Sequence, residues 1–379
     1  MRVRWSLLPR GLRRCLVWGA KAVLTGGAFY LLLSHPIETA SGDTVAVWRA
    51  LAEHLGGLDP SAFVPLLLAA TAIKLVGIAC SMGRWHLLLI GQGIRFDVWH
   101  VVGAFLTGRF LGTFLPSTAG LDGYKLYDAA RFSGRLVQPA AATAVEKAMG
   151  LGGIFLTFLL TLPLGMDILG PAAGTVVAVT VPLACGVLAG LFLALFRPWW
   201  VQGLLRLLPD FGRQRLQRFI TQVSEAVAAY GGQGMLLAVV MVLSFAVHFA
   251  TAAMYYLTAL AVGATGAGFW QVSFASSIQI LATVMSPFTI AGEGVREIVQ
   301  ALLLARHIGT SASVLSAALG FWAAEAVTLV GVFFWWGRGG AHYRPRRLWL
   351  DGVPVQGPEL SAAGAGDERV PCRANNRAS

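Results

Sequence analysis

Charge is scarce in this chain. Only 12% of its 379 residues are Asp, Glu, Lys or Arg, whereas 56% are hydrophobic. A typical soluble domain carries about 25% charged residues, because its surface must face water. The scarcity of charge therefore excludes a soluble globular protein and indicates a chain embedded in a membrane.

Cysteine is also rare, and the acidic residues are few. The four cysteines lie far apart and form no C-x-x-C motif, so no disulfide framework, metal site or cofactor is expected. The 29 basic residues outnumber the 18 acidic ones. They flank apolar segments instead of forming one basic stripe, so they indicate membrane topology, and no nucleic-acid partner is expected.

Long apolar runs are abundant. A helix needs about 20 mostly apolar residues to cross the hydrocarbon core of a bilayer. Six stretches meet this requirement, at roughly 14–34, 61–81, 138–163, 172–196, 235–263 and 311–336. No convincing signal-peptidase site follows the first stretch, which is therefore expected to be retained as a span. The predicted fold is an all-α, polytopic membrane bundle with about six full spans.

Basic residues are distributed unevenly around these spans. They gather before the first span, after the second (Arg84 and Arg95), after the fourth and after the sixth. Because Lys and Arg concentrate in cytoplasmic loops, both termini are predicted to be cytoplasmic. Segment 199–230 alternates basic and apolar residues with helical spacing, which fits an interfacial helix or a plain cytoplasmic connector. The tail 338–379 is rich in Pro, Gly, Ala and Arg and is predicted to be disordered.

Two shorter apolar stretches, 98–115 and 268–285, are each followed by Pro, Gly, several charges and a second half-apolar helix. They are predicted to be re-entrant hairpins. The tip 116–125 aligns without gaps on the tip 287–296, and both read P-x-T-x-small-x-acid-G-x-base. With six crossings the hairpins enter from opposite sides, which predicts an inverted repeat with halves at roughly 60–196 and 235–337.

Each residue type in the two tips has a physical reason to be there. Pro ends the entering helix, Gly allows a close turn, Thr can cap the next helix, and an acid and a base three residues apart can pair. The free N–H groups at the start of the second half-helix can bind an anion such as phosphate. A charge at the bilayer centre costs roughly 2.5–3.5 kcal/mol, so these side chains must face protein or a wet cavity. The predicted substrate-binding residues are Thr118, Asp122, Lys125, Glu146, Thr289, Glu293, Arg296, Glu297 and Glu325.

The alternative interpretation of this cluster is a structural ion-pair network that holds the two broken helices together. Three more polar residues are further candidates for the same cavity. Lys74 lies in the middle of a span, but a Lys can also reach the interface along its own stem. Arg109 in the first hairpin has the same two interpretations as Lys74. His248 can carry a proton, or it can simply pack among aromatic neighbours.

The same segments resemble the flippase-like family typified by the transmembrane region of lysylphosphatidylglycerol synthase, the bacterial multiple peptide resistance factor. The resemblance covers roughly 20–337 and is carried by GRFLGTFLPSTAGLDGYKLYDAAR, AVEKAMGL, SPFTIAGEGVRE and LGFWAAEA. Leu121 precedes Asp122 where the family usually has Gly. Lys125 and Lys147 stand where members tend to have Arg, which keeps the charge but loses the bidentate fork.

The resemblance implies a lipid translocase in the bacterial cytoplasmic membrane that moves an anionic or lipid-phosphate-linked headgroup. The expected partners are a phospholipid or a polyprenyl-phosphate-linked lipid, and lipid-synthesis enzymes. No segment resembles an aminoacyl-transfer domain, so the protein is not expected to be an enzyme. Two alternatives stay open: an integral-membrane transferase with Glu146, Glu293 or Glu325 as general base, and a scaffold in lipid, polyprenyl-sugar or hopanoid metabolism that acts through 199–230.

Overall fold

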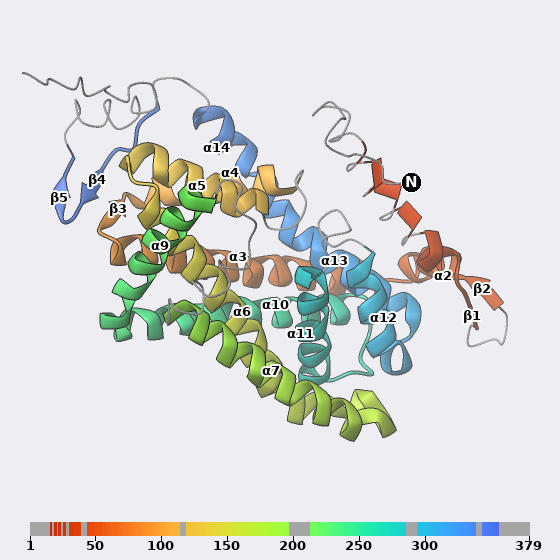
Figure 1. Cartoon of the computed structure of the whole chain (residues 1–379). Helices are drawn as coiled ribbons and strands as arrows, with labels where there is room; N and C mark the ends of the chain where they lie inside the picture. Colours follow the sequence, from red (N-terminus) through yellow and green to blue (C-terminus); the bar gives the residue numbers. More distant parts are fainter. Residues whose placement is uncertain are drawn as a thin grey trace, which may run out of the picture.

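The protein is a helical bundle (Figure 1). The computed structural model describes residues 16, 19–20, 22–23, 26–27, 30–38, 44–113, 119–196, 213–285, 294–338 and 343–355. Its helices are α2 (Val47–Gly56), α3 (Pro60–Gly91), α4 (Val98–Thr113), α5 (Ala119–Ser133), α6 (Val137–Gly165), α7 (Ala173–Phe196), α9 (Arg213–Ala228), α10 (Gly234–Ala261), α11 (Phe269–Met285), α12 (Val295–Ile308), α13 (Thr310–Leu329) and α14 (Gly331–Arg338), with 3₁₀ segments η2 (Met166–Ala172) and η3 (Ala229–Gly232). The short strands are β1 (Pro36–Glu38), β2 (Thr44–Ala46), β3 (Ile94–Phe96), β4 (Leu348–Leu350) and β5 (Val353–Pro354).

Within the described residues, five helical segments are long and apolar enough to cross a membrane. They are Pro60–Gly91, Val137–Pro171, Ala173–Gly190, Gly234–Ala261 and Thr310–Arg338. These segments match the second to sixth predicted spans. The first predicted span, 14–34, falls largely outside the described residues. The prediction of a multi-pass, all-α membrane protein is therefore confirmed, whereas the count of six spans stays a prediction.

The two segments predicted to be hairpins are each a pair of short helices. Helix α4 packs against α5, and α11 packs against α12. The 16 residues of α4 extend for only about 24 Å at 1.5 Å per residue, less than the roughly 30 Å hydrocarbon core. The connecting tips, 114–118 and 286–293, lie outside the described residues. Helix α4 is thus somewhat too short to cross the core, and the re-entrant course of the two pairs stays a prediction.

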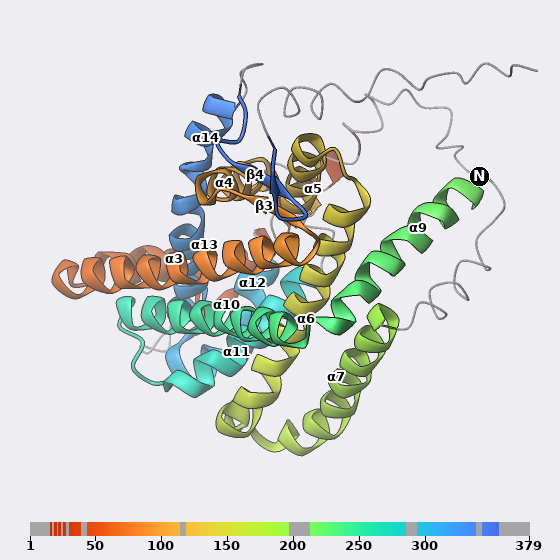
Figure 2. The same ribbon diagram turned by 90° about the vertical axis from the view of Figure 1, so that its left-hand side faces the viewer.

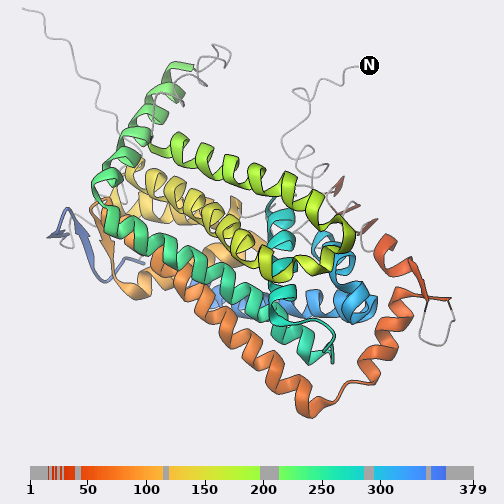
Figure 3. The same cartoon turned by 90° about the horizontal axis from the view of Figure 1, so that it is seen from below.

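The chain repeats one order of helix lengths. Long α3, short α4 and α5, and long α6 are followed later by long α10, short α11 and α12, and long α13. The first members, α3 and α10, lie side by side (Figures 1 and 3). The last member of each series packs on helices of the other series: α6 packs on α10 and α11, and α13 packs on α3 and α4. This order divides the eight helices into a first half, α3–α6, and a second half, α10–α13, which pack on each other; their relation by an inverted repeat stays a prediction.

The apolar core is divided between the two ends of the α3–α10 pair. One cluster contains Trp85 near the end of α3 and Val240 near the start of α10, together with residues of α4, α5 and the start of α6. The other contains Ala70 of α3 and Met254 of α10, with residues of α11, α12 and α13. The α4–α5 pair and the α11–α12 pair are therefore packed at opposite ends of the bundle.

Residues 343–355 correct one prediction. The sequence predicts a disordered tail from 338 onwards, but strands β4 and β5 add to β3 in an antiparallel sheet. The guanidinium of Arg135 donates two hydrogen bonds to Asp351, at 3.1 and 2.5 Å. Strands of two and three residues are too short to be stable alone, and pairing with β3 stabilises them here. Residues 356–379 lie outside the described part.

Helix α9 occupies the described part of the segment predicted to be interfacial. It lies to one side of the bundle with α7 (Figure 2) and ends at η3. There the buried Tyr230 hydroxyl donates a 2.6 Å hydrogen bond to the carbonyl of Leu88 on α3, and burial raises the pKa of this phenol. The segment is therefore anchored to the bundle at its end, while its contact with a lipid surface stays a prediction.

Candidate functional site

A buried ion pair joins α5 to α6. The Lys125 ammonium lies 2.6 Å from Oε2 of Glu146, and the two residues are only 1% and 3% exposed. The same ammonium lies 3.3 Å from Oδ1 of Asp122, one turn earlier on α5. The sequence prediction that Asp122 and Lys125 pair on one helix face is thus confirmed. Their contact with Glu146 brings together three of the predicted site residues.

Two further bases complete this cluster. Nη2 of Arg84 on α3 lies 3.3 Å from Oε1 of Glu146, and Nζ of Lys147 on α6 lies 2.5 Å from Oδ2 of Asp122. We call Arg84, Asp122, Lys125, Glu146 and Lys147 the buried charge network; the Lys147 side chain is 50% exposed and lies at its edge. It contains three bases and two carboxylates, so its formal charge is +1. Each carboxylate contacts two bases, and Lys125 is shared between both carboxylates.

The surroundings of the network are apolar. The Lys125 ammonium lies 5.6 Å from the ring centre of Trp85 and 5.3 Å from that of Phe105, distances at which a cation interacts with an aromatic face. Nη1 of Arg84 donates a 3.1 Å hydrogen bond to the buried hydroxyl of Ser244 on α10. Arg84 and Lys125 are therefore surrounded by aromatic and apolar groups besides the carboxylates and Ser244, and their charges are weakly screened.

Arg84 was not among the predicted site residues. The sequence placed it in a cytoplasmic loop after a span ending near residue 81, but α3 continues to Gly91 and buries Arg84 to 8% exposure. The signal that could have found it is the apolar run 87–90, which extends the helix past the arginine. A charge between two apolar runs of one helix must face a partner.

A second ion pair lies between α4 and α13. Arg109 Nη2 is 3.3 Å from Glu325 Oε1, and Arg109 Nε donates a 3.0 Å hydrogen bond to Thr328. Lys74 on α3 donates a 3.0 Å hydrogen bond to Thr251, and it lies within electrostatic range of Arg109, Glu325 and Arg296. The structure therefore gathers the candidates Lys74, Arg109 and Glu325 where α3, α4 and α13 meet.

Arg296 and Glu297 are buried at the start of α12. The Arg296 guanidinium lies 4.4 Å from the ring centre of Phe321 on α13. The Glu297 carboxylate accepts a 2.8 Å hydrogen bond from the backbone N–H of Gly294, whose φ of +82° favours glycine. Glu297 thus caps its own helix. A contact with substrate would have to be made by a carboxylate that already has this structural role.

The remaining predicted residues divide into two groups. Thr118, Thr289 and Glu293 lie outside the described residues, so their predicted roles stay predictions. His248 Nε2 lies 3.0 Å from the carbonyl oxygen of Gly150 on α6. This contact fits the packing interpretation of His248 better than that of a proton carrier, because a neutral imidazole satisfies the carbonyl.

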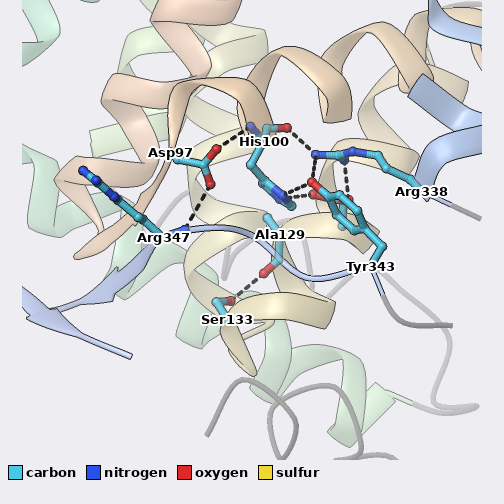
Figure 4. A network of polar contacts seen from close by, with 8 residues as sticks. Asp97, His100, Ala129, Ser133, Arg338, Tyr343 and Arg347 are labelled. Carbon is cyan, nitrogen blue, oxygen red and sulfur yellow. Dashed lines mark hydrogen bonds and ion pairs between the residues drawn. The ribbon is translucent and has the colours of Figure 1, made fainter. Parts of the chain in front are cut away.

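A third polar cluster closes one end of the bundle (Figure 4). The Asp128 carboxylate on α5 binds Nε2 of His100 at 2.7 Å and Nη1 of Arg338 at 2.9 Å. The Tyr343 hydroxyl contacts Nδ1 of His100 and Nη2 of Arg338, both at 3.0 Å. The sequence did not single out these four residues, because they come from three distant segments and only folding brings them together.

These features define a class of protein: a polytopic α-helical membrane protein with ion pairs buried between its helices. The family model described as the lysylphosphatidylglycerol synthase TM region matches residues 19–332, and the chain belongs to this family. The resemblance inferred from the hairpin motifs is thereby confirmed. No curated protein matched the chain. The protein is thus an integral membrane protein of a family linked to lipid metabolism.

Proposed function

We propose that this protein is a lipid translocase, and that the buried charge network attracts the anionic or phosphate-linked headgroup of its cargo. The observation that carries the proposal is the excess of bases in the network: Arg84, Lys125 and Lys147 against Asp122 and Glu146. A network serving only to hold helices together is most stable when its charges balance. The excess positive charge favours the binding of an anion, which can approach from the side of the half-exposed Lys147.

The arrangement of the charges within the network also supports a transient ligand. Lys125 contacts both carboxylates, and each carboxylate keeps another base if Lys125 turns away: Arg84 for Glu146, and Lys147 for Asp122. A headgroup phosphate can therefore compete for Lys125 without leaving a carboxylate unpaired. The carboxylates hold the bases in position when no lipid is bound.

The division of the core supports alternating access. The α4–α5 pair packs at one end of the α3–α10 pair, and the α11–α12 pair packs at the other end. In transporters built from inverted repeats, paired half-helices reach the substrate site from opposite sides, and the two halves rock against each other. The second half contributes Arg296 on α12 as its counterpart to Lys125, at the aligned position of its tip.

The experiment that tests this proposal is reconstitution into liposomes with labelled anionic phospholipid, in which exposure of the headgroup on the far leaflet is measured. The informative variant is Lys125→Met. It removes the shared base, keeps nearly the same side-chain length and leaves two bases facing two carboxylates, each acid with one partner. We expect the variant to fold and to lose at least nine-tenths of the exposure rate.

The matched control is Arg135→Gln. Arg135 follows α5 and pairs with the exposed Asp351, so this variant also removes one positive charge next to the same helix. It is expected to keep the parent rate. A Lys125→Met protein that translocates as fast as the parent would exclude the network as the headgroup site. A chemically altered lipid would favour the transferase, and an unchanged leaflet distribution with the parent protein would favour the scaffold.

A further inference from the structure

A cavity of about 560 Å³ opens beside the polar cluster of Figure 4. It lies between the start of α4, the end of α14 and the segment that begins at Tyr343. No residue of the buried charge network is among its described lining residues. The adjoining backbone forms the β3–β4–β5 sheet, so this end of the bundle lies where the chain leaves its long apolar helices.

The polar side of the cavity is basic. Three arginines line it, Arg338, Arg344 and Arg346, and Asp97 supplies the one carboxylate among its described lining residues. The Asp97 oxygens accept hydrogen bonds from two backbone N–H groups, those of His100 at 3.0 Å and Arg347 at 3.3 Å. Asp128 pairs with Arg338 at 2.9 Å, so the three arginines outnumber these two carboxylates by one and the cavity as a whole favours an anion.

Arg338 is held in a fixed position at the cavity wall. Its Nη1 donates to Asp128 at 2.9 Å, and its Nη2 donates to the carbonyl of His100 at 2.5 Å and to the Tyr343 hydroxyl at 3.0 Å. The guanidinium carbon, Cζ, lies 4.9 Å from the Tyr343 ring centre. An arginine fixed by several partners presents its charge with little loss of side-chain entropy, and planar guanidinium groups match the oxygens of a phosphate.

The other side of the cavity is aromatic. Trp99, Phe333 and Phe334 line it, and the first two are 68% and 72% exposed. Large exposed aromatic side chains next to arginines are typical of the membrane–water interface, where the ring contacts acyl chains and the basic group meets headgroups. A ligand that satisfies both sides carries a phosphate next to an apolar body.

We propose that this cavity binds the phosphate of an anionic membrane phospholipid, with Arg338, Arg344 and Arg346 as the phosphate ligands and Trp99 against the adjoining glycerol and acyl region. This binding site is additional to the buried charge network, and it does not rest on translocation, because it is defined by equilibrium binding alone. A soluble phosphate compound would use the arginines without the aromatic wall.

The test measures binding of dihexanoyl-phosphatidylglycerol to the purified full-length protein by calorimetry, with dihexanoyl-phosphatidylcholine and inorganic phosphate as comparison ligands. The variant is Arg344→Gln with Arg346→Gln. Its control is Arg347→Gln, in the same segment, whose side chain points away from Arg338 in Figure 4 and does not line the cavity. We expect the double variant to raise the Kd for the phosphatidylglycerol at least tenfold and the control to change it less than twofold.

A second variant separates the two sources of phosphate. Trp99 is exposed, so Trp99→Ala should not affect folding; we expect it to weaken binding of the phosphatidylglycerol at least threefold and not that of inorganic phosphate. If inorganic phosphate binds as tightly as the phosphatidylglycerol, the cavity is a site for soluble anions and the lipid proposal is wrong. The proposal is also overturned if both the double variant and Trp99→Ala bind the phosphatidylglycerol as the parent does, or if the phosphatidylcholine binds equally well.

Discussion

Arg84 and Glu146 are 62 residues apart in the sequence, and their side chains meet at 3.3 Å inside the bundle. The pair links α3 to α6, while Lys125 links the same carboxylate to α5. Three helices of the first half are thus joined at one glutamate. Because Arg84 also donates to Ser244 on α10, the network reaches the second half of the protein.

The first prediction concerns the charge balance of this network. Glu146→Gln leaves Arg84, Lys125 and Lys147 facing Asp122 alone, and removing one partner of a buried ion pair typically costs about 3–5 kcal/mol. We expect a loss of that size in the free energy of unfolding, measured by denaturant titration in detergent micelles. Adding Lys125→Met returns the network to its original net charge and should recover part of the loss. An unchanged stability in the single variant would show that the network is hydrated.

The second prediction concerns topology. If the two short-helix pairs enter from opposite sides, the open ends of the two hairpins face opposite compartments. Leu136, 53% exposed between α5 and α6, and Arg306, exposed in the last turn of α12, are suitable positions for single cysteines. In a background without the native cysteines, an impermeant thiol reagent added to intact cells should label only one of the two. Labelling of both from the same side would rule out the inverted repeat.

Much of this fold is predictable from the sequence, because its long spans and broken helices are local patterns. Apolar runs of sufficient length predict α3, α6, α10 and α13, and Pro and Gly predict the breaks after α4 and α11. The contact between Asp122 and Lys125 follows from helical spacing alone. These features depend on neighbouring residues in the chain, and the sequence records them directly.

The partners that join distant helices are not predictable in this way. Arg84 follows an apolar run just as a loop arginine does, and only the packing of α3 on α6 identifies Glu146 as its partner. Strands β4 and β5 lie in a composition typical of disorder, and their stability comes from β3 and Arg135, more than 200 residues away along the chain. Tertiary contacts here override local tendency.

The third prediction tests a close contact between α6 and α10 at Gly153. A Cβ on Gly153 would lie 2.9 Å from the carbonyl carbon and oxygen of Ser244, so Gly153→Ala forces the two backbones apart. Overpacking of this kind typically costs about 1–3 kcal/mol. We expect a lower melting temperature in detergent and a weakened contact between Arg84 and Ser244. The control Gly186→Ala, on α7 with nothing within 4 Å, should be neutral or slightly stabilising.

The fourth prediction concerns the attachment of residues 343–355. The Arg135 guanidinium beside Asp351 holds the pKa of that carboxyl below its usual value of 3.8. A carboxyl whose pKa is lower in the folded state stabilises that state above its unfolded pKa, and the contribution is lost as the pH falls through the folded value. The attachment should therefore be constant from neutral pH down to about 4 and weaken below it.

The measurement is hydrogen exchange of the backbone amides in 348–354, compared between the parent and Asp351→Asn at each pH so that intrinsic exchange cancels. Asn is a suitable replacement because Asp351 has a φ of +51°, which Asn tolerates. At neutral pH the variant should exchange faster than the parent, and the difference should shrink as the pH falls below about 4 and through the lower pKa of the folded Asp351 carboxyl. A difference that persists unchanged at acid pH would mean that Asp351 holds the strands through neutral hydrogen bonds and not through its charge.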